Sequence, residues 1–153
     1  MASTKCGFEN APGGVSGLVL LVSLGPTLLV DIGFDPNFNP NVPGIPTPGV
    51  KGIQALVDTG AKESCIDNLL AAQLNLPIVD RRPISGIGGR QETNMYLAQI
   101  HVPALPFTIY GAFAGVDLVA GGQVHSALIG RTFLMRVTMT YEGRTGIVTL
   151  STD

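Results

Sequence analysis

The chain has 153 residues, the length of one domain, and a domain of this size buries roughly two-thirds of its unfolded surface. Hydrophobic residues make up 45% and charged residues 13%, which excludes an intrinsically disordered chain, and a net charge of −2 without a basic patch argues against nucleic-acid binding. Twenty glycines and eleven prolines among many β-branched residues favour a turn-rich β protein.

The N-terminal part contains a polar segment followed by an apolar run. Residues 1–13 are polar and glycine-bearing, so we expect a flexible segment ahead of a single domain at 14–153. The run from Leu18 to Val30 spans 13 residues and is broken by Gly-Pro, so it is too short to cross a bilayer. Without a basic segment before it or a cleavage site after it, it is not expected to be a signal peptide. It predicts two buried strands, 15–23 and 27–34.

A loop and a short strand come next. Residues 35–49 are rich in Asn, Pro and Gly and lack periodicity, so they predict a surface loop. Residues 52–57 form a short apolar strand that ends at an aspartate, Asp58. The clearest helix covers 68–74, with Asp67 as a good N-cap residue.

The rest of the chain predicts mostly strands. A hairpin with a glycine-rich tip is expected, with 83–89 leading to a strand at 96–102. Further elements are a strand at 107–116, an apolar run at 127–130, a short helix from 131 to 134, and a final hairpin of 137–141 and 147–150. The expected architecture is mainly β, with one or two short helices.

The sequence predicts neither a metal site nor a cofactor. The cysteines Cys6 and Cys65 are far apart and lack metal-ligand spacing, and only two histidines, His101 and His125, occur. Two reduced thiols suit a cytoplasmic protein, or a soluble part of a longer one.

The segment Ala55-Leu-Val-Asp-Thr-Gly-Ala61 carries the chemistry. A carboxylate directly after an apolar strand is unusual, because a buried, ionised and unpaired carboxylate is costly. It must find donors or share a proton. Gly60 leaves room beside it and lets backbone approach closely.

This segment resembles the active-site motif of retropepsin-like aspartic peptidases, the retroviral-protease type. Two further motifs follow in the family's order. Gly86, Ile87, Gly88 and Gly89 resemble the tip of the flap that closes over bound peptide, and Leu128-Ile129-Gly130-Arg131 resembles the second glycine motif with its short helix. The resemblance covers residues 15–151 and implies a closed or partly closed acid-protease barrel with a flap hairpin.

The resemblance implies that Asp58 is the catalytic residue and that it works in a pair. One carboxylate takes a proton from water, while its protonated partner donates to the scissile carbonyl. At ~4 Å and an effective dielectric near 20, the repulsion between two such charges is about 4 kcal/mol, so the pair keeps one proton. Among the other aspartates only Asp31, in Asp-Ile-Gly, is at all similar to the motif. The partner carboxylate must therefore come from a second copy of the chain, in a homodimer.

The resemblance also assigns supporting roles. The Thr59 hydroxyl would bond across the dimer, although a local turn bond is the alternative. Gly60 would present backbone to substrate, and Ile87 would be the apolar contact of the flap. Ala61 cannot donate the hydrogen bond that lowers the dyad pKa in pepsin-like relatives, so a weakly acidic activity optimum is expected.

Three features depart from the family pattern. Lys62 stands where an acidic residue commonly pairs with the arginine of the second motif, so either Glu63 replaces it or Arg131 bonds backbone carbonyls. The loop 35–49 is longer than a minimal enzyme needs and could be an exosite, a dimer contact or decoration. The terminal hairpin differs from the single strand that ties viral dimers together.

The sequence thus favours a homodimeric aspartic endopeptidase acting on extended peptides with hydrophobic residues around the cut. One alternative is a module on the same fold that binds a peptide or protein without cleaving it. Another is a structural β domain with a chance tripeptide.

Overall fold

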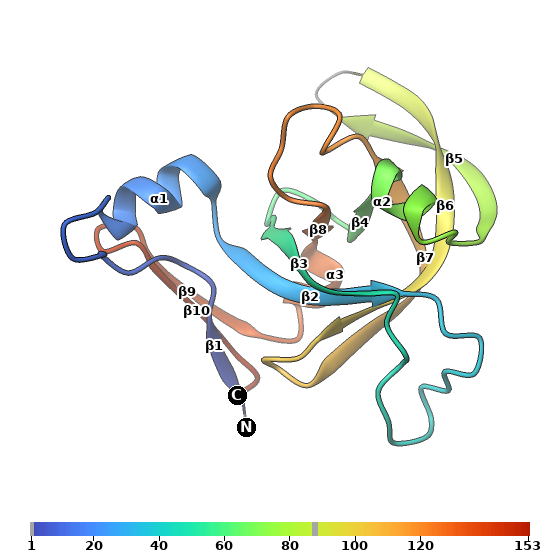
Figure 1. The fold of residues 1–153 in the computed structure, drawn as a ribbon, viewed down its shortest axis with the longest axis horizontal. Coiled ribbons are helices and arrows are strands. Elements are labelled where there is room, and N and C mark those ends of the chain that lie inside the picture. The colour runs from blue at the N-terminus through green and yellow to red at the C-terminus, as the bar shows by residue number, and fades with distance from the viewer. Residues whose placement is uncertain (1, 87–88) are drawn as a thin grey trace.

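The computed structural model describes residues 2–86 and 89–153. Two sheets and three short helices make up the fold (Figure 1). In chain order the elements are β1 (Ser3–Lys5), α1 (Gly17–Leu24), β2 (Thr27–Gly33), β3 (Val50–Val57), β4 (Cys65–Asp67), α2 (Asn68–Gln73), β5 (Ile78–Gly86), β6 (Gly89–Val102), β7 (Phe107–Val116), β8 (Ala127–Ile129), α3 (Arg131–Leu134), β9 (Thr138–Glu142) and β10 (Ile147–Ser151).

The larger sheet curls into a ring. Its seven strands run in the order β2-β3-β8-β4-β7-β6-β5, and β2 also pairs with β6, which closes the ring and leaves β5 attached to β6. The strand β8 is parallel to β3, whereas most other neighbours are antiparallel. The predicted fold class, mainly β with a partly closed barrel and short helices, is confirmed.

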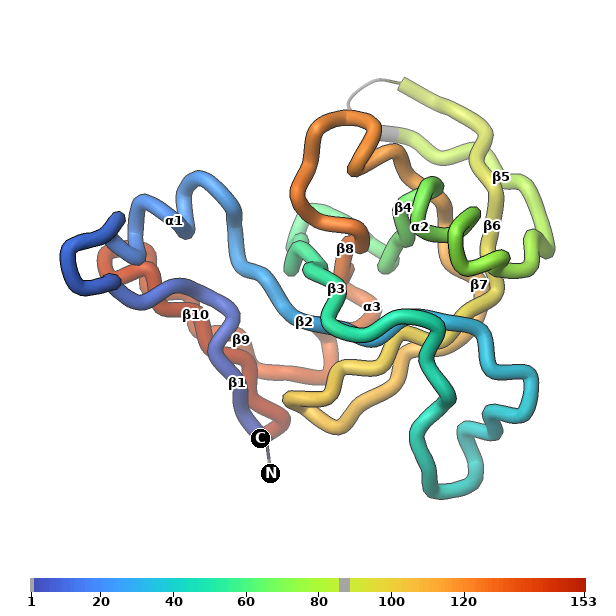
Figure 2. Tube along the Cα trace, in the orientation of Figure 1, coloured from blue at the N-terminus to red at the C-terminus, as the bar shows by residue number. Residues whose placement is uncertain are grey.

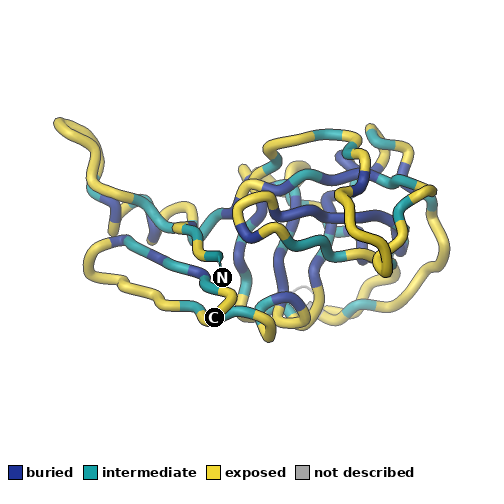
Figure 3. The backbone as a smooth tube through the Cα atoms, turned by 90° about the horizontal axis from the view of Figure 1, so that it is seen from below, coloured by how far each residue is buried: buried dark blue, intermediate teal, exposed yellow. Residues whose placement is uncertain are grey.

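The smaller sheet forms a lobe at one side of the barrel. Its order is β1-β10-β9, and α1 lies next to it (Figures 1 and 2). The lobe is mostly exposed or intermediate, while the buried stretches are concentrated in the barrel (Figure 3). One core nevertheless links both parts, since Cys6, Leu21 and Val148 of the lobe belong to the same buried cluster as Ile32 and Ile129 of the barrel.

The structure corrects the strand predicted at 15–23, where a helix forms instead. The Ser16 hydroxyl accepts from the Val19 N–H at 3.4 Å, and Gly25 ends the helix at φ +74° with its N–H bonded to Leu21 O at 2.9 Å. An unbroken apolar run has no period that separates strand from helix, so these two caps decide the outcome. The second predicted strand, 27–34, is confirmed as β2.

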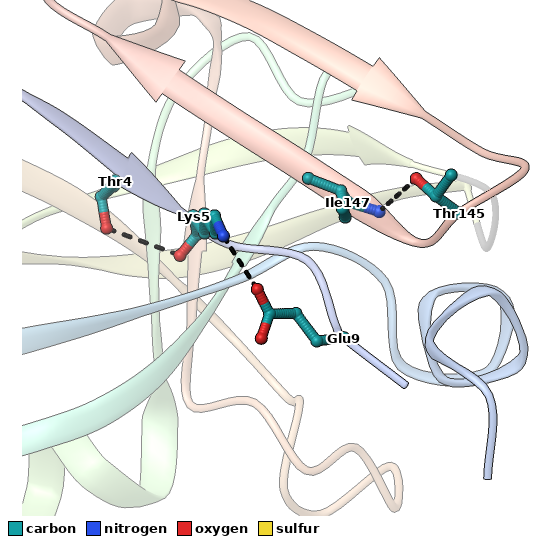
Figure 4. Close-up of polar contacts among 5 residues, drawn as sticks. All are labelled: Thr4, Lys5, Glu9, Thr145 and Ile147. Carbon is teal, nitrogen blue, oxygen red and sulfur yellow. Dashed lines mark hydrogen bonds and ion pairs between the residues drawn. The ribbon is translucent and has the colours of Figure 1, made fainter. Parts of the chain in front are cut away.

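The structure also places a strand in the N-terminal segment, where we expected none. The strand β1 pairs antiparallel with β10, from Ser3 opposite Ser151 to Lys5 opposite Thr149. Figure 4 shows this region, with the Lys5–Glu9 ion pair at 2.8 Å. The segment is held because the final hairpin, which the sequence does predict, leaves one edge of β10 free for β1.

The remaining predicted elements are present, several with longer bounds. The helix α2 begins after Asp67 as expected, and β7 and α3 have the predicted bounds. The strands β5 and β6 extend the predicted hairpin, and Gly86 pairs with Gly89 at its end. Its tip residues Ile87 and Gly88 lie outside the described residues.

The proline-rich segment 35–49 is a loop, as predicted, and it is held at its base. The Asp35 carboxylate accepts from the N–H groups of Asn37 and Thr47, both at 2.9 Å, and these bonds, that to Thr47 first, lower the pKa of Asp35. The Asp35 N–H donates to the Gln99 side chain at 2.7 Å. These contacts give the loop a defined position beside the barrel (Figure 1).

None of the helices described here is both long and apolar enough to cross a bilayer.

Candidate active site

Asp58 stands where two parallel strands end side by side. Val57, the last residue of β3, is opposite Ile129, the last residue of β8. The Asp58 N–H then donates to Ile129 O at 2.9 Å, so the pairing continues one residue past the strand. The Val57 N–H bonds the other neighbour, Pro26 O, at 2.8 Å. The aspartate is therefore held by backbone on a rigid part of the sheet.

The Asp-Thr-Gly segment folds into a tight turn around the carboxylate. The Gly60 N–H donates to Asp58 Oδ1 at 2.9 Å, and the Ala61 N–H donates to Asp58 O at 3.2 Å. A Cβ on Gly60 would come within 3.1 Å of Asp58 Oδ1. Asp58 is half-buried, while Thr59 and Gly60 are exposed. The turn presents one carboxylate at the surface with its orientation fixed by a backbone donor.

The second glycine motif packs directly against this turn. A Cβ on Gly130 would lie 2.5 Å from Glu63 O and 3.0 Å from Ala61 O, so only glycine fits there. The Gly130 N–H donates to the buried Ser64 hydroxyl at 3.1 Å, and the Arg131 N–H donates to Ala61 O at 2.9 Å. The two motifs, about 70 residues apart in the chain, thus form one structural unit.

The Arg131 side chain settles one of the alternatives left open by the sequence. Its Nη1 donates to Thr59 O at 2.8 Å, and within the described ranges it makes no ion pair with Glu63. Arg131 therefore braces the turn through a backbone carbonyl. The neighbours Leu128 and Ile129 are half-buried and buried, and they belong to β8 rather than to the exposed surface.

No second carboxylate of the chain lies beside Asp58. The Asp31 carboxylate accepts from the Gly52 N–H at 3.1 Å, six residues before Asp58 along the same strand, or roughly 20 Å away. Asp67 is fully buried and accepts from four backbone N–H groups, so it too is committed elsewhere. Neither of these two aspartates is therefore placed to pair with Asp58 within the described chain.

The thiols near the site are protonated at neutral pH. Burial, and to a lesser degree the Glu63 and Asp58 carboxylates, raise the pKa of Cys65 to about 11, and burial alone raises that of Cys6 to about 11. Both cysteines are free. Over the described part of the chain, no three His, Cys, Asp or Glu residues gather in a way that could hold a metal ion.

The flap residues predicted from the sequence are only partly described. Gly86 and Gly89 close the β5–β6 hairpin, and Gly89 adopts φ +97°, which favours glycine. The positions of Ile87 and Gly88 fall in the gap between the described ranges.

Two supporting residues were not foreseen from the sequence. The Ser64 hydroxyl accepts a hydrogen bond from the Gly130 N–H. The buried His125 is bonded through Nε2 to Thr27 Oγ1 at 2.8 Å, and Thr27 follows Pro26, whose carbonyl accepts from the Val57 N–H. Neither has a sequence signal, because each role depends on contacts between segments more than 60 residues apart.

No family model and no curated protein matches the sequence. Among solved structures, the chain is similar to the EIAV protease in complex with the inhibitor HBY-793, with 20% sequence identity and a TM-score of 0.47, over 72% of this chain and 85% of that chain.

Proposed function

We propose that the chain is an aspartic endopeptidase that works as a homodimer, with Asp58 of each copy forming the catalytic pair. The observation that carries this proposal is the Asp58 turn: a carboxylate at the end of β3, oriented by the Gly60 N–H and braced by Gly130 and Arg131. Peptide hydrolysis by two carboxylates requires a partner within contact distance. Since none lies there in the described chain, a twofold axis next to Asp58 supplies it.

The chemistry follows from one shared proton. The ionised carboxylate of the pair removes a proton from a water molecule as that water attacks the scissile carbonyl. The protonated carboxylate donates a hydrogen bond to the carbonyl oxygen, where negative charge develops. In the next step, the proton that was removed from water is passed to the leaving nitrogen, and the C–N bond breaks. No covalent intermediate with the enzyme is needed.

The exposed residues of the turn suit a dimer contact. Thr59 is exposed next to Asp58, so its hydroxyl is free to reach the second copy across the axis. Ala61 offers no hydroxyl to stabilise an ionised pair, so we expect an activity optimum in the weakly acidic range. A pH–rate profile that peaks near pH 2 to 3 would contradict this expectation.

Substrate would lie as an extended chain between the Asp58 turn and the β5–β6 hairpin. The glycines at the hairpin end, Gly86 and Gly89, allow backbone to approach a peptide of any sequence. We expect hydrophobic side chains on both sides of the cut bond.

The test is an Asp58→Asn variant, which keeps the shape of the turn and removes the ionisable group. Wild type and variant are incubated with a denatured protein between pH 4 and 7, after circular dichroism and sedimentation show equal folding and association. Cleavage by wild type alone supports the proposal. No cleavage by either protein supports the alternative, a module that binds a peptide or protein without cutting it.

A further inference from the structure

The strand β7 has a backbone edge that no other described strand covers. It pairs with β6 from Phe107 to Ala114, but on its other side β4 reaches only residues 114–116. Between 107 and 113, no described residue makes a backbone hydrogen bond to this outer side. Alternate residues of an edge strand point their N–H and C=O groups outward, so this stretch is a template for another strand.

This free edge borders a groove. A cavity of about 390 Å³ lies between β7 and the segments that brace the active-site turn. Its lining includes Ile109 and Ala112 of β7 and, from other segments, Glu63, Ser64 and Phe133. An added strand in this groove would lie in line with β4, which already occupies the next part of the same edge.

The groove continues toward the proline-rich loop. A second cavity of about 550 Å³ is lined by residues 40–44 of that loop and shares Phe107, Thr108, Tyr110 and Arg136 with the first. The Phe38 and Tyr110 rings contact each other with centroids 5.7 Å apart, so the loop is fixed against β7. Together the two cavities follow the free edge of seven residues, roughly 23 Å.

The charged side chains that line the first cavity are Arg82, Arg136 and Glu63, and the two arginines favour an acidic occupant. The Arg136 guanidinium lies 5.1 Å from the centre of the Phe107 ring, and no carboxylate of the described chain is within 4 Å of it. The other arginine of the lining, Arg82, is held by Asp80 at 3.0 Å. Arg136 therefore offers an uncommitted cation beside the unpaired edge.

We propose that this groove binds an extended, acidic segment of the substrate protein, outside the stretch that is cut, by adding it as a strand to β7. The inference rests on the proposed function, because it makes the groove an exosite for the same reaction. Backbone bonds along residues 107–113 would give affinity for any extended chain. A carboxylate bonded to Arg136 and apolar side chains against Phe107 and Tyr110 would select the sequence.

Binding is tested apart from catalysis with the Asp58→Asn protein. The probe is a fluorescein-labelled peptide, Val-Glu-Val-Tyr-Val-Glu-Val, and its counterpart with Lys in place of Glu, measured by fluorescence anisotropy. We expect the acidic peptide to bind more tightly and Arg136→Glu to weaken it about tenfold while strengthening the lysine peptide. Arg144→Glu, a change at an exposed arginine in the β9–β10 turn, is the matched control and should alter neither. Equal binding of both peptides, or equal effects of both variants, would overturn the proposal.

Catalysis is tested in the otherwise wild-type chain. Arg136→Glu should lower kcat/KM for a long unfolded substrate such as denatured casein and leave kcat/KM for an eight-residue peptide unchanged. If wild type cleaves neither, the proposed function fails while the peptide binding can still hold. If Arg136→Glu cleaves both substrates like wild type, the exosite fails and the peptidase stands. Weaker self-association of Arg136→Glu in sedimentation would assign the groove to a second copy and contradict the proposal.

Discussion

Asp67 shows how much one side chain can organise near the candidate site. Its carboxylate is fully buried and accepts from the N–H groups of Leu69 and Leu70 at the start of α2, and from Leu118 and Val119 in a distant loop, all between 2.9 and 3.1 Å. The first pair is the predicted N-cap. The second pair was not predictable, because no local pattern links residue 67 to residue 118.

Replacing Asp67 should therefore cost more than the loss of a helix cap. Asp67→Ala leaves four backbone donors without an acceptor, one of them buried and three part-buried, and we expect a loss of about 3 kcal/mol in the free energy of unfolding, against about 1 for a cap alone. Urea unfolding at fixed protein concentration measures it. Asp117→Ala, which removes an exposed carboxylate bonded to Asn68, is the control and should cost much less. Equal losses would show that the buried network contributes little.

His125 gives the fold a pH dependence of its own. His125 Nε2 and Thr27 Oγ1 are hydrogen-bonded at 2.8 Å, and buried Nδ1 has no partner among the described residues. Burial lowers the pKa of His125 from its ordinary value of 6.5. The unfolded chain therefore binds the proton more readily, and stability falls as the pH drops below about 6.5 toward the folded-state pKa.

This effect can be isolated by comparing wild type with His125→Gln. Unfolding free energies are measured at pH 5 and pH 7, and the loss on acidification should be smaller in the variant. Between pH 7 and 8, where the imidazole is neutral in both states, the two proteins should show the same pH dependence. An equal loss on acidification would assign the effect to other groups.

At the scale of elements, the helix α1 is the largest departure from expectation and also the most informative. Its sequence is apolar apart from Ser23, so the pattern could not distinguish a strand from a helix. The structure buries only Gly17 and Leu21 and leaves Val22 78% and Val19 47% exposed. An apolar helix with so little cover is unusual in a single soluble chain.

The position of α1 suggests what covers it. Pro26, two residues beyond the helix, accepts from the Val57 N–H, next to Asp58, and a Cβ at Gly25 would lie 2.7 Å from Leu56 Cδ1. The start of β2, which follows α1, pairs with the end of β3, Thr27 opposite Leu56, so α1 leads into the sheet beside the strand end that precedes Asp58. If the second copy meets the first at Asp58, as proposed, α1 lies within its reach.

We therefore expect Val22→Asp to weaken the dimer by at least about tenfold, since a charge would be buried at the contact. Sedimentation measures the dissociation constant, and activity lost at low protein concentration should return as the concentration is raised. Val79→Asp, the same change at an exposed valine on β5, should have no effect. A dimer unaffected by Val22→Asp would place the interface elsewhere.

The bounds of an element were predicted best where the sequence contains residues that end a strand or helix. The bounds of β7 and α3 were predicted, and β3 and β8 nearly so, because turn residues or the Asp-Thr-Gly and Gly-Arg motifs mark their ends. The strand β1 was missed because three polar residues gain order only from the edge of β10. Sheet partners depend on the whole chain, so local patterns do not contain them.

At the scale of the molecule, the barrel brings the two glycine motifs together, and this was expected only through the resemblance to retroviral proteases. The parallel pairing of β3 with β8 is what places Gly130 and Arg131 against the Asp58 turn. The order of the motifs along the chain predicted which segments would form the candidate site. Their contact geometry, including the Arg131 bond to Thr59 O, needed the structure.

The central claim is that one chain holds half of an active site, and mixing subunits tests it most directly. Wild type is incubated with increasing amounts of Asp58→Asn, under conditions where dimers are saturated and subunits exchange, and activity is measured below KM. If the pair spans two chains, activity per wild-type chain falls to about half in an equal mixture and to about a tenth at ninefold excess of the variant, because mixed dimers lack one carboxylate. Activity per wild-type chain that does not change with added Asp58→Asn would contradict the claim.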